Sequence, residues 1–246
     1  TFEFIPDSEE RQMAFIQDKI EEKLTVLAKM KDADKSGRNL ITRQAEKEVE
    51  QLKEELADLT TTLSEKRTAK DEKKRAVTKQ NTEVKAREML ERRTDETENF
   101  DDMGIDALLI DEAHEYKHLG FATAMQRGVK GIDPSYSKKS QGVFLKTQAV
   151  LQKSHGRNVI FATGTPISNT AAEIWTFMRY LMPSETMKEY GIYYFDDFVR
   201  NFGNIQQMLE FTTSGKFKEN NRFAGYIDLP ELVRIWSSVS DTVRTK

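Results

Sequence analysis

The fold is decided by two stretches, IDALLIDEAH at residues 105–114 and RNVIFATGT at residues 157–165. Each begins with a short apolar run and continues into polar residues, as a buried strand does where it enters a loop. Apolar residues at helical spacing over 143–153 separate the two stretches, and a second helix over 171–181 ends before Pro183. The order strand, helix, strand, helix predicts an α/β fold with a parallel sheet.

The DEAH string follows the carboxyl end of the first predicted strand, the edge of a parallel sheet at which ligands bind. There Asp111 can hold a magnesium ion, usually through water, and Glu112 can orient and deprotonate an attacking water. Nucleoside triphosphate hydrolysis needs both functions. Adjacent acids also suit a helix N-terminus, but Ala113 and His114 directly after them make the string far more specific. The pattern favours Asp111, Glu112 and His114 as catalytic residues.

The second string places two hydroxyl groups at the end of the other predicted strand. Thr163 and Thr165 flank Gly164 there, and their hydroxyls could bond His114 or the acid pair and so couple the site to neighbouring structure. Taken alone, the string is also an ordinary strand-to-helix turn with threonine capping and Pro166 at the helix start. Its occurrence together with the acid motif favours the coupling function.

The N-terminal region has a different character. Residues 8 to about 95 contain Gly37 as the only glycine and no proline, and their composition is that of long helices. A turn is predicted at residues 34–39. Apolar residues recur at steps of three or four on both sides of it: Met13, Ile16, Ile20, Leu24 and Leu27, then Ala45, Val49, Leu52, Leu56, Leu59 and Leu63. We therefore expect an antiparallel coiled-coil hairpin whose arms, at ~1.5 Å per residue, protrude on the order of 37 Å.

Composition excludes several classes of protein. The 246 residues carry a net charge of -3, so any basic surface must be local. Residues 64–94 carry a local excess of Lys and Arg. This stretch is either a solvated helical face or a contact with nucleic acid or a partner. The absence of cysteine excludes disulfides and thiolate metal sites, and suits a reducing cytoplasm. No apolar run approaches the roughly 20 residues of a membrane span. The chain starts at Thr1 without an initiator Met, so we expect an excised piece of a longer protein.

The strings at residues 111–120 and 161–169 resemble motif II, the DEAH box, and motif III of superfamily-two helicases, closest to the Swi/Snf-like branch. Further strings resemble the Swi/Snf-like helicase region of large phage and mobile-element proteins that join a helicase to an adenine-specific DNA methylase, the DarB-like antirestriction proteins among them. These strings are FD at 195–196, NFG at 201–203, RF at 222–223 and LPEL at 229–232. The resemblance covers roughly residues 100–246.

The resemblance implies an ATP-dependent DNA helicase or translocase with two RecA-like lobes that bind ATP and magnesium between them. It implies that Asp111 holds the magnesium and that residues 163–165, as motif III, couple the site to neighbouring structure. No G-x-x-x-x-G-K-[ST] phosphate loop and no methylase Asp/Asn-Pro-Pro-Tyr/Phe string occurs in the chain. We therefore expect a partial P-loop motor lobe that is inactive as an ATPase alone. Its partners would be DNA, the remaining motor lobe and a methylase region of a longer protein.

The predicted organisation has three parts: a helical coiled-coil insertion over 1–99, the C-terminal half of a RecA-like lobe over 100–185, and a helical extension over 186–246. An alternative function is a coiled-coil module that binds a partner or self-associates, with the motor half as its scaffold. A degenerate ATPase is a third possibility.

Three basic residues are candidate DNA contacts. Lys117 follows the acid motif and is either an ordinary surface lysine or a residue that contacts DNA or couples the site. Lys138 and Lys139 lie in a polar stretch over 135–140 that we expect to be a loop able to reach phosphates. Large aromatic residues are expected in the core or between lobes: Trp175, Phe195, Phe198, Phe202, Phe211 and Trp236.

Overall fold

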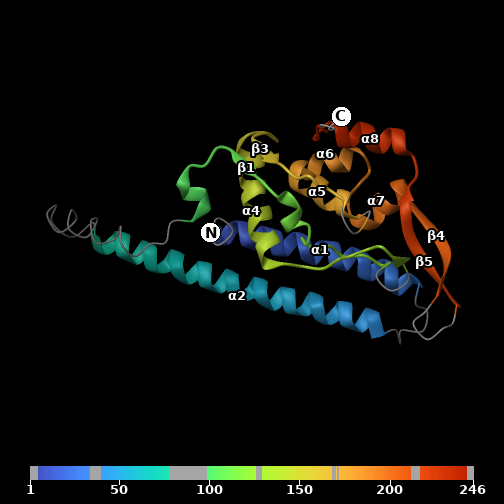
Figure 1. The fold of residues 1–246 in the computed structure, drawn as a ribbon. Helices are drawn as coiled ribbons and strands as arrows, with labels where there is room; N and C mark the ends of the chain where they lie inside the picture. Colours follow the sequence, from blue (N-terminus) through green and yellow to red (C-terminus); the bar gives the residue numbers. More distant parts are fainter. Residues whose placement is uncertain are drawn as a thin grey trace.

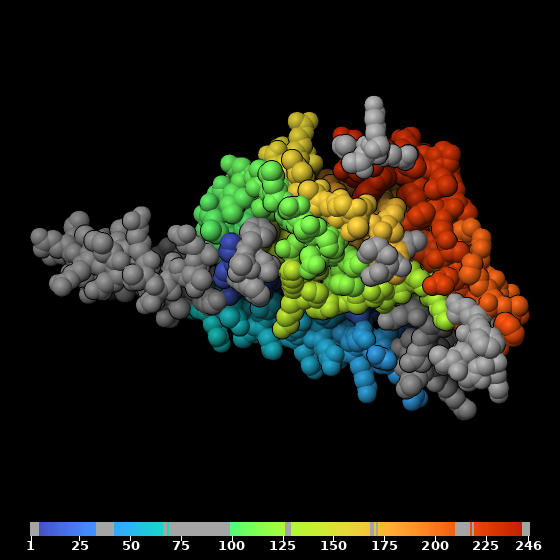
Figure 2. Space-filling view, in the orientation of Figure 1, coloured from blue at the N-terminus to red at the C-terminus, as the bar shows by residue number. Residues whose placement is uncertain are grey.

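The computed structural model of the chain describes residues 5–33, 40–77, 99–125, 129–167, 170, 172–211 and 217–242. Its body is a mixed α/β structure, with a two-stranded sheet near one end and a three-stranded sheet near the other (Figure 1). Helix α1 runs along the body, and α2 lies outside α1 (Figure 1). In the space-filling view α1 is largely hidden, whereas α2 is visible along the lower edge (Figure 2).

The two-stranded sheet pairs β1 (Leu108–Ile110) with β3 (Val159–Phe161) in parallel. The chain passes between these strands through α4 (Lys138–Lys153), and α5 (Glu173–Leu181) follows β3. The predicted order strand, helix, strand, helix and the parallel pairing are confirmed. Both strands are shorter than the apolar runs that predicted them.

Only one face of this sheet is covered by the residues that the structure describes. Leu108 and Ile110 are buried toward α4 and α5, in clusters with residues of those helices. Leu109 and Ile160 lie opposite each other on the other face and are 76% and 57% exposed. We expected buried strands, and this open apolar face is a departure from that expectation. Strands of parallel sheets are normally covered on both faces.

The two long helices form an antiparallel pair, α1 (Glu9–Ala33) and α2 (Leu40–Val77). Two ion pairs cross between them, Lys23 with Glu48 at 2.5 Å and Lys31 with Glu46 at 2.7 Å. Along α2, the residues of the predicted seam are less exposed than most of their neighbours, and Val49 is buried. The helical hairpin is therefore present over the described residues.

The hairpin does not stand away from the body along α1, which corrects the expectation of a protruding arm. Phe15 and Ile16 are buried, and the Phe15 ring lies 5.6 Å from that of Phe144 in α4. Glu22 is also buried, and its carboxylate accepts a hydrogen bond from the backbone N–H of Ala122 at 3.2 Å. Phe15 beside Ile16 widens the apolar stripe of α1 beyond a coiled-coil seam, so α1 packs on both α2 and the body.

The chain segments on either side of the hairpin come together on the body. The backbone N–H of Phe100, at the start of the 3-10 helix η2 (Phe100–Met103), donates to the carbonyl of Pro6 at 2.8 Å. Next to it, the fully buried Nζ of Lys146 lies 3.1 Å from a carboxylate oxygen of Asp7. Residues just before α1 and residues 99–103 therefore meet at one place on the body.

The C-terminal part contains a β-hairpin, whereas we expected a helical extension over 186–246. Its helices are α6 (Ser184–Glu189), α7 (Phe195–Phe202) and α8 (Leu229–Ser237). Its strands β4 (Gly203–Phe211) and β5 (Phe217–Tyr226) pair antiparallel, and β2 (Val129–Lys130) adds to β5 in parallel. The three boundaries drawn from the sequence stay predictions.

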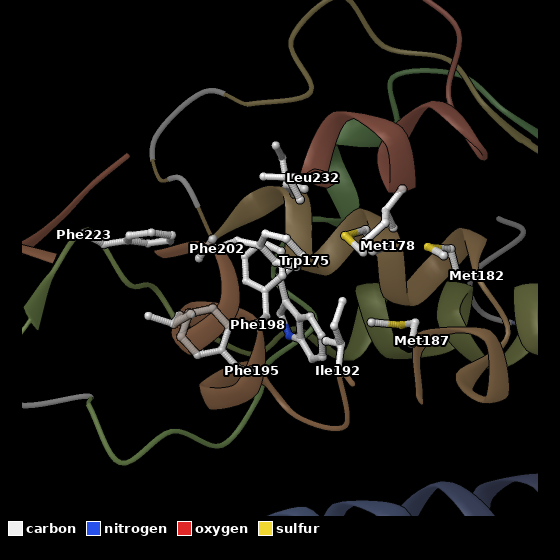
Figure 3. Close-up of a cluster of buried hydrophobic side chains, with 14 residues drawn as sticks. Trp175, Met178, Met182, Met187, Ile192, Phe195, Phe198, Phe202, Phe223 and Leu232 are labelled. Atoms are coloured by element: carbon white, nitrogen blue, oxygen red, sulfur yellow. The ribbon is translucent and has the colours of Figure 1, made fainter. Parts of the chain in front are cut away.

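The largest core cluster lies between α5, α7, α8 and β5 (Figure 3). Trp175, Phe195, Phe198 and Phe202 are all buried in it, as expected, whereas Trp236 is partly buried at its edge. The side chain of Phe211 lies outside the described residues. None of the helices in the described part of the chain is long and apolar enough to cross a membrane.

Candidate functional site

The two polar strings leave the parallel sheet at the same edge. The backbone N–H of Ala162 donates to the carbonyl of Ile110 at 2.8 Å, and that of Ala113 donates to the carbonyl of Ala162 at 3.0 Å. These bonds extend the pairing just past β1 and β3. Residues 111–114 and Thr163 are therefore held side by side at the carboxyl ends of the two strands.

Asp111 and Glu112 form a tight turn on the surface. Glu112 has φ +50°, in the left-handed region that residues other than glycine rarely adopt. Its backbone N–H donates to Oδ1 of Asp111 at 2.8 Å, which fixes the orientation of that carboxylate. Both side chains are solvent-exposed. The pair is thus accessible to a ligand, and the backbone strain lies at the residue expected to activate water.

His114 links the two strings. It belongs to the 3-10 helix η3 (Ala113–Tyr116), and its Nδ1 lies 3.3 Å from Oγ1 of Thr163 and 3.2 Å from a carboxylate oxygen of Glu112. The structure therefore brings together four predicted site residues: Asp111, Glu112, His114 and Thr163. Gly164 and Thr165 are exposed beyond them, and Thr165 donates its N–H to Oγ1 of Thr163 at 3.1 Å.

The three candidate DNA-binding lysines lie in different environments. Nζ of Lys117 lies 3.3 Å from a carboxylate oxygen of Glu173, and the two side chains are only 13% and 7% exposed. Of the two functions weighed for Lys117, this geometry favours internal coupling. Lys138 and Lys139 belong to the first turn of α4 and not to a loop, which corrects that part of the expectation. Lys138 is exposed, whereas Lys139 contacts Glu115 at 3.4 Å.

Helix α5 contributes contacts that sequence reasoning missed. The hydroxyl of Tyr180 lies 3.0 Å from the carbonyl oxygen of Tyr116 and 2.8 Å from that of Ser140, and its one proton is shared between them. Arg179 donates to the carbonyl of Gly120 at 2.9 Å. Burial raises the pKa of Tyr180, which keeps its hydroxyl protonated as a donor. The sequence held one signal for these contacts. Glu173 is an acidic residue in a largely apolar helix, and a buried carboxylate needs a partner.

A magnesium ion that is shared with a ligand would find oxygen donors at Asp111. Within the described residues, no three His, Cys, Asp or Glu side chains gather as a metal site. Mg²⁺ commonly binds through one or two carboxylates together with waters and phosphate oxygens, so a dedicated protein cage is not needed. The accessible carboxylate of Asp111 supplies the hard oxygen donors that such an ion prefers.

Two comparisons with known proteins bear on the family of this chain. The family described as "Probable helicase domain" matches residues 65–245 of this chain. "Defense against restriction protein B" of Escherichia phage P1 is 27% identical over 139 residues, which make up 54% of this chain. That match spans only 6% of the phage protein's length. No solved structure matches the chain.

Proposed function

This chain belongs to the probable helicase domain family, and we propose that it carries the metal-binding and water-activating half of the ATPase site of a DNA helicase or translocase. One observation carries the proposal: Asp111, Glu112 and His114 follow β1, and Thr163, which follows β3, lies 3.3 Å from His114. In this proposal residues 111–114 are a superfamily-two motif II and residues 163–165 a motif III of the Swi/Snf-like type.

Each residue has a distinct function in the proposed site. Asp111 holds Mg²⁺, and the ion bound there would offset negative charge on the phosphates of ATP. Glu112 orients and deprotonates the attacking water. His114 and Thr163 connect the acid pair to the segment after β3. A movement of residues 163–165 would therefore also displace the acid pair. Lys138, exposed at the start of α4, is the best placed of the three lysines for a DNA phosphate.

The proposed lobe is a RecA-like lobe that is completed by other parts of a longer protein. The open face that carries Leu109 and Ile160 supports this, because a parallel sheet normally buries both faces. A phosphate-cradling loop, a second lobe and a methylase region would come from that longer protein, which we propose acts on DNA in defence against restriction, as the name of the phage relative suggests.

We further propose that the hairpin of α1 and α2 is an insertion in this lobe. The hydrogen bond from Phe100 to Pro6 supports this, because it joins the chain before the hairpin to the chain after it. Insertions are tolerated where the two ends of the inserted segment lie close together.

The proposal is tested by DNA-stimulated ATP hydrolysis of the longer protein that contains this chain. We expect Glu112→Gln to lower kcat by about 10²- to 10⁴-fold, the usual contribution of a general base, with ATP binding retained. Glu231→Gln is the matched control, because it makes the same change in charge on the surface of α8. We also expect the 246-residue chain alone to hydrolyse no ATP. Equal activity of Glu112→Gln and Glu231→Gln would contradict the assignment.

A second candidate function is a coiled-coil interaction module. It is favoured by the length of α2, 38 residues against 25 for α1, and by seam residues of α2 that stay partly exposed, such as Leu56 and Leu59. Light scattering of the chain distinguishes the two candidates. Dimerisation that Leu56→Lys abolishes favours the module, whereas a monomer with salt-sensitive DNA binding favours the motor.

A further inference from the structure

Helix α5 holds the segment that follows the acid pair at three points. Glu173 pairs with Lys117, Tyr180 donates to the carbonyl of Tyr116, and Arg179 donates to the carbonyl of Gly120. Within residues 113–120, regular structure is limited to the four-residue 3-10 helix η3 and a bridge from Leu119 to Tyr136. The position of this segment therefore depends on contacts from outside it, and α5 supplies a buried ion pair among them.

We propose that Glu173 is a positioning residue for the ATPase site, acting through Lys117 on the backbone that carries His114 and Glu112. This inference rests on the proposed function. Glu173 lies in the first turn of α5, ten residues after Thr163, whereas Lys117 lies three residues after His114. The pair therefore joins the segment after motif II to the segment after motif III by a contact separate from that of His114 with Thr163.

Burial makes this contact specific. An exposed ion pair contributes little and does not hold a segment in one place. A pair with both side chains almost fully buried is different, because two opposite charges attract each other more strongly where water is excluded. If residues 113–120 moved so that Lys117 left Glu173, this attraction would be lost, so such positions of the segment are disfavoured. Backbone strain at Glu112 is consistent with a segment held from outside, since such strain persists only when surrounding contacts enforce it.

Proton NMR of the imidazole rings tests the positioning on the 246-residue chain itself, without nucleotide. The chain has three histidines, so each can be assigned: His114 and His118 lie on the positioned segment, and His155 lies after α4. We expect Glu173→Gln to shift the Hε1 and Hδ2 resonances of His114 and to leave those of His155 unchanged. Glu231→Gln is the control and should move none of them. Unchanged His114 resonances in Glu173→Gln, or equal shifts at His114 and His155, would overturn the inference.

A double variant separates positioning from stability. Lys117→Met with Glu173→Leu removes both buried charges, so the Tm lost in Glu173→Gln should be regained. We expect the His114 resonances to remain displaced in this variant, because apolar packing lacks the specificity of the pair. Their return to the wild-type positions together with Tm would show that the pair serves stability alone, and would overturn the inference.

Kinetics of the longer protein complete the test. A displacement of about 1 Å at a reacting group can cost on the order of 10²-fold in rate. We expect Glu173→Gln to lower kcat about 10- to 100-fold with KM for ATP little changed, since the loss is in transition-state geometry. A change confined to KM would contradict positioning. Absence of ATPase activity in the wild-type longer protein would instead refute the proposed function, and the NMR result would still decide whether Glu173 positions His114.

Discussion

At the scale of single residues, Glu112 combines a left-handed backbone conformation with a proposed function in water activation. Its left-handed conformation costs a residue with a Cβ roughly 1–2 kcal/mol, and a β-branched residue more. Asparagine tolerates that conformation better than most residues. The same position is proposed to activate water, so stability and activity should respond differently to substitution.

We expect Glu112→Asn to keep the Tm of the chain and Glu112→Val to lower its free energy of unfolding, because a β-branched residue pays more than glutamate in this conformation. Urea denaturation of both variants measures the difference. Both should lose ATPase activity in the longer protein. Equal stability of the Asn and Val variants would show that the left-handed turn is absent in solution.

Lys19 provides a pH-dependent contribution to stability. Burial, and next the charge of Arg179, lowers the pKa of Lys19 from 10.5 to about 8. Below pH 8 both the folded and unfolded states carry the proton, and the cost of burying the charge is fully present. Between about pH 8 and 10.5 the unfolded state binds more protons, so stability rises with pH.

We therefore expect the free energy of unfolding of the wild type to rise relative to that of Lys19→Met between about pH 7 and about pH 9.5. The gain should not exceed about 3 kcal/mol, at ~1.4 kcal/mol per pKa unit, and partial exposure of the side chain reduces it. Urea titrations of both proteins at the two pH values give the comparison. A gain of equal size in Lys19→Met would assign it to another group.

At the scale of elements, the periodicity of the sequence predicted the two parallel strands but did not predict the β-hairpin of β4 and β5. The apolar runs before Asp111 and Thr163 became β1 and β3 because they pack on α4 and α5. The hairpin of β4 and β5 gave no such signal, since residues 205–209 are all exposed and need no alternation of apolar and polar residues. The contacts of Glu173 and Tyr180 with the site depend on how α5 packs, which no local pattern encodes.

The docking of α1 on the body leads to an element-scale prediction. Phe15 is 5% exposed and packs on Phe144, whereas Leu24 on the same helix is 43% exposed. We expect Phe15→Ala to lower the free energy of unfolding by about 3–5 kcal/mol, the usual range for a buried phenylalanine. Leu24→Ala is the matched control and should cost less than about 1 kcal/mol. Equal effects in chemical denaturation would indicate that α1 stands free of the body, as the seam alone predicted.

At the scale of the whole molecule, one apolar face of the parallel sheet is left uncovered by the residues that the structure describes. Leu109 and Ile160 face each other across β1 and β3, and their exposure means that they add little to the stability of the isolated chain. Exposed apolar surface of this kind promotes association when no partner covers it. In the proposed longer protein the same face would be buried by the rest of the lobe.

This difference predicts opposite outcomes in two contexts. In the 246-residue chain, Leu109→Thr with Ile160→Thr should leave Tm within a few degrees of the wild type and reduce concentration-dependent association, measured by sedimentation velocity. In the longer protein, the same pair should cost about 2–4 kcal/mol, because two apolar side chains are then removed from a buried contact. Val233→Thr on α8, 54% exposed, is the control and should be neutral in both contexts. If the double variant destabilises the short chain as strongly as the long one, the face is already covered within this chain, and the partial-lobe proposal loses its structural support.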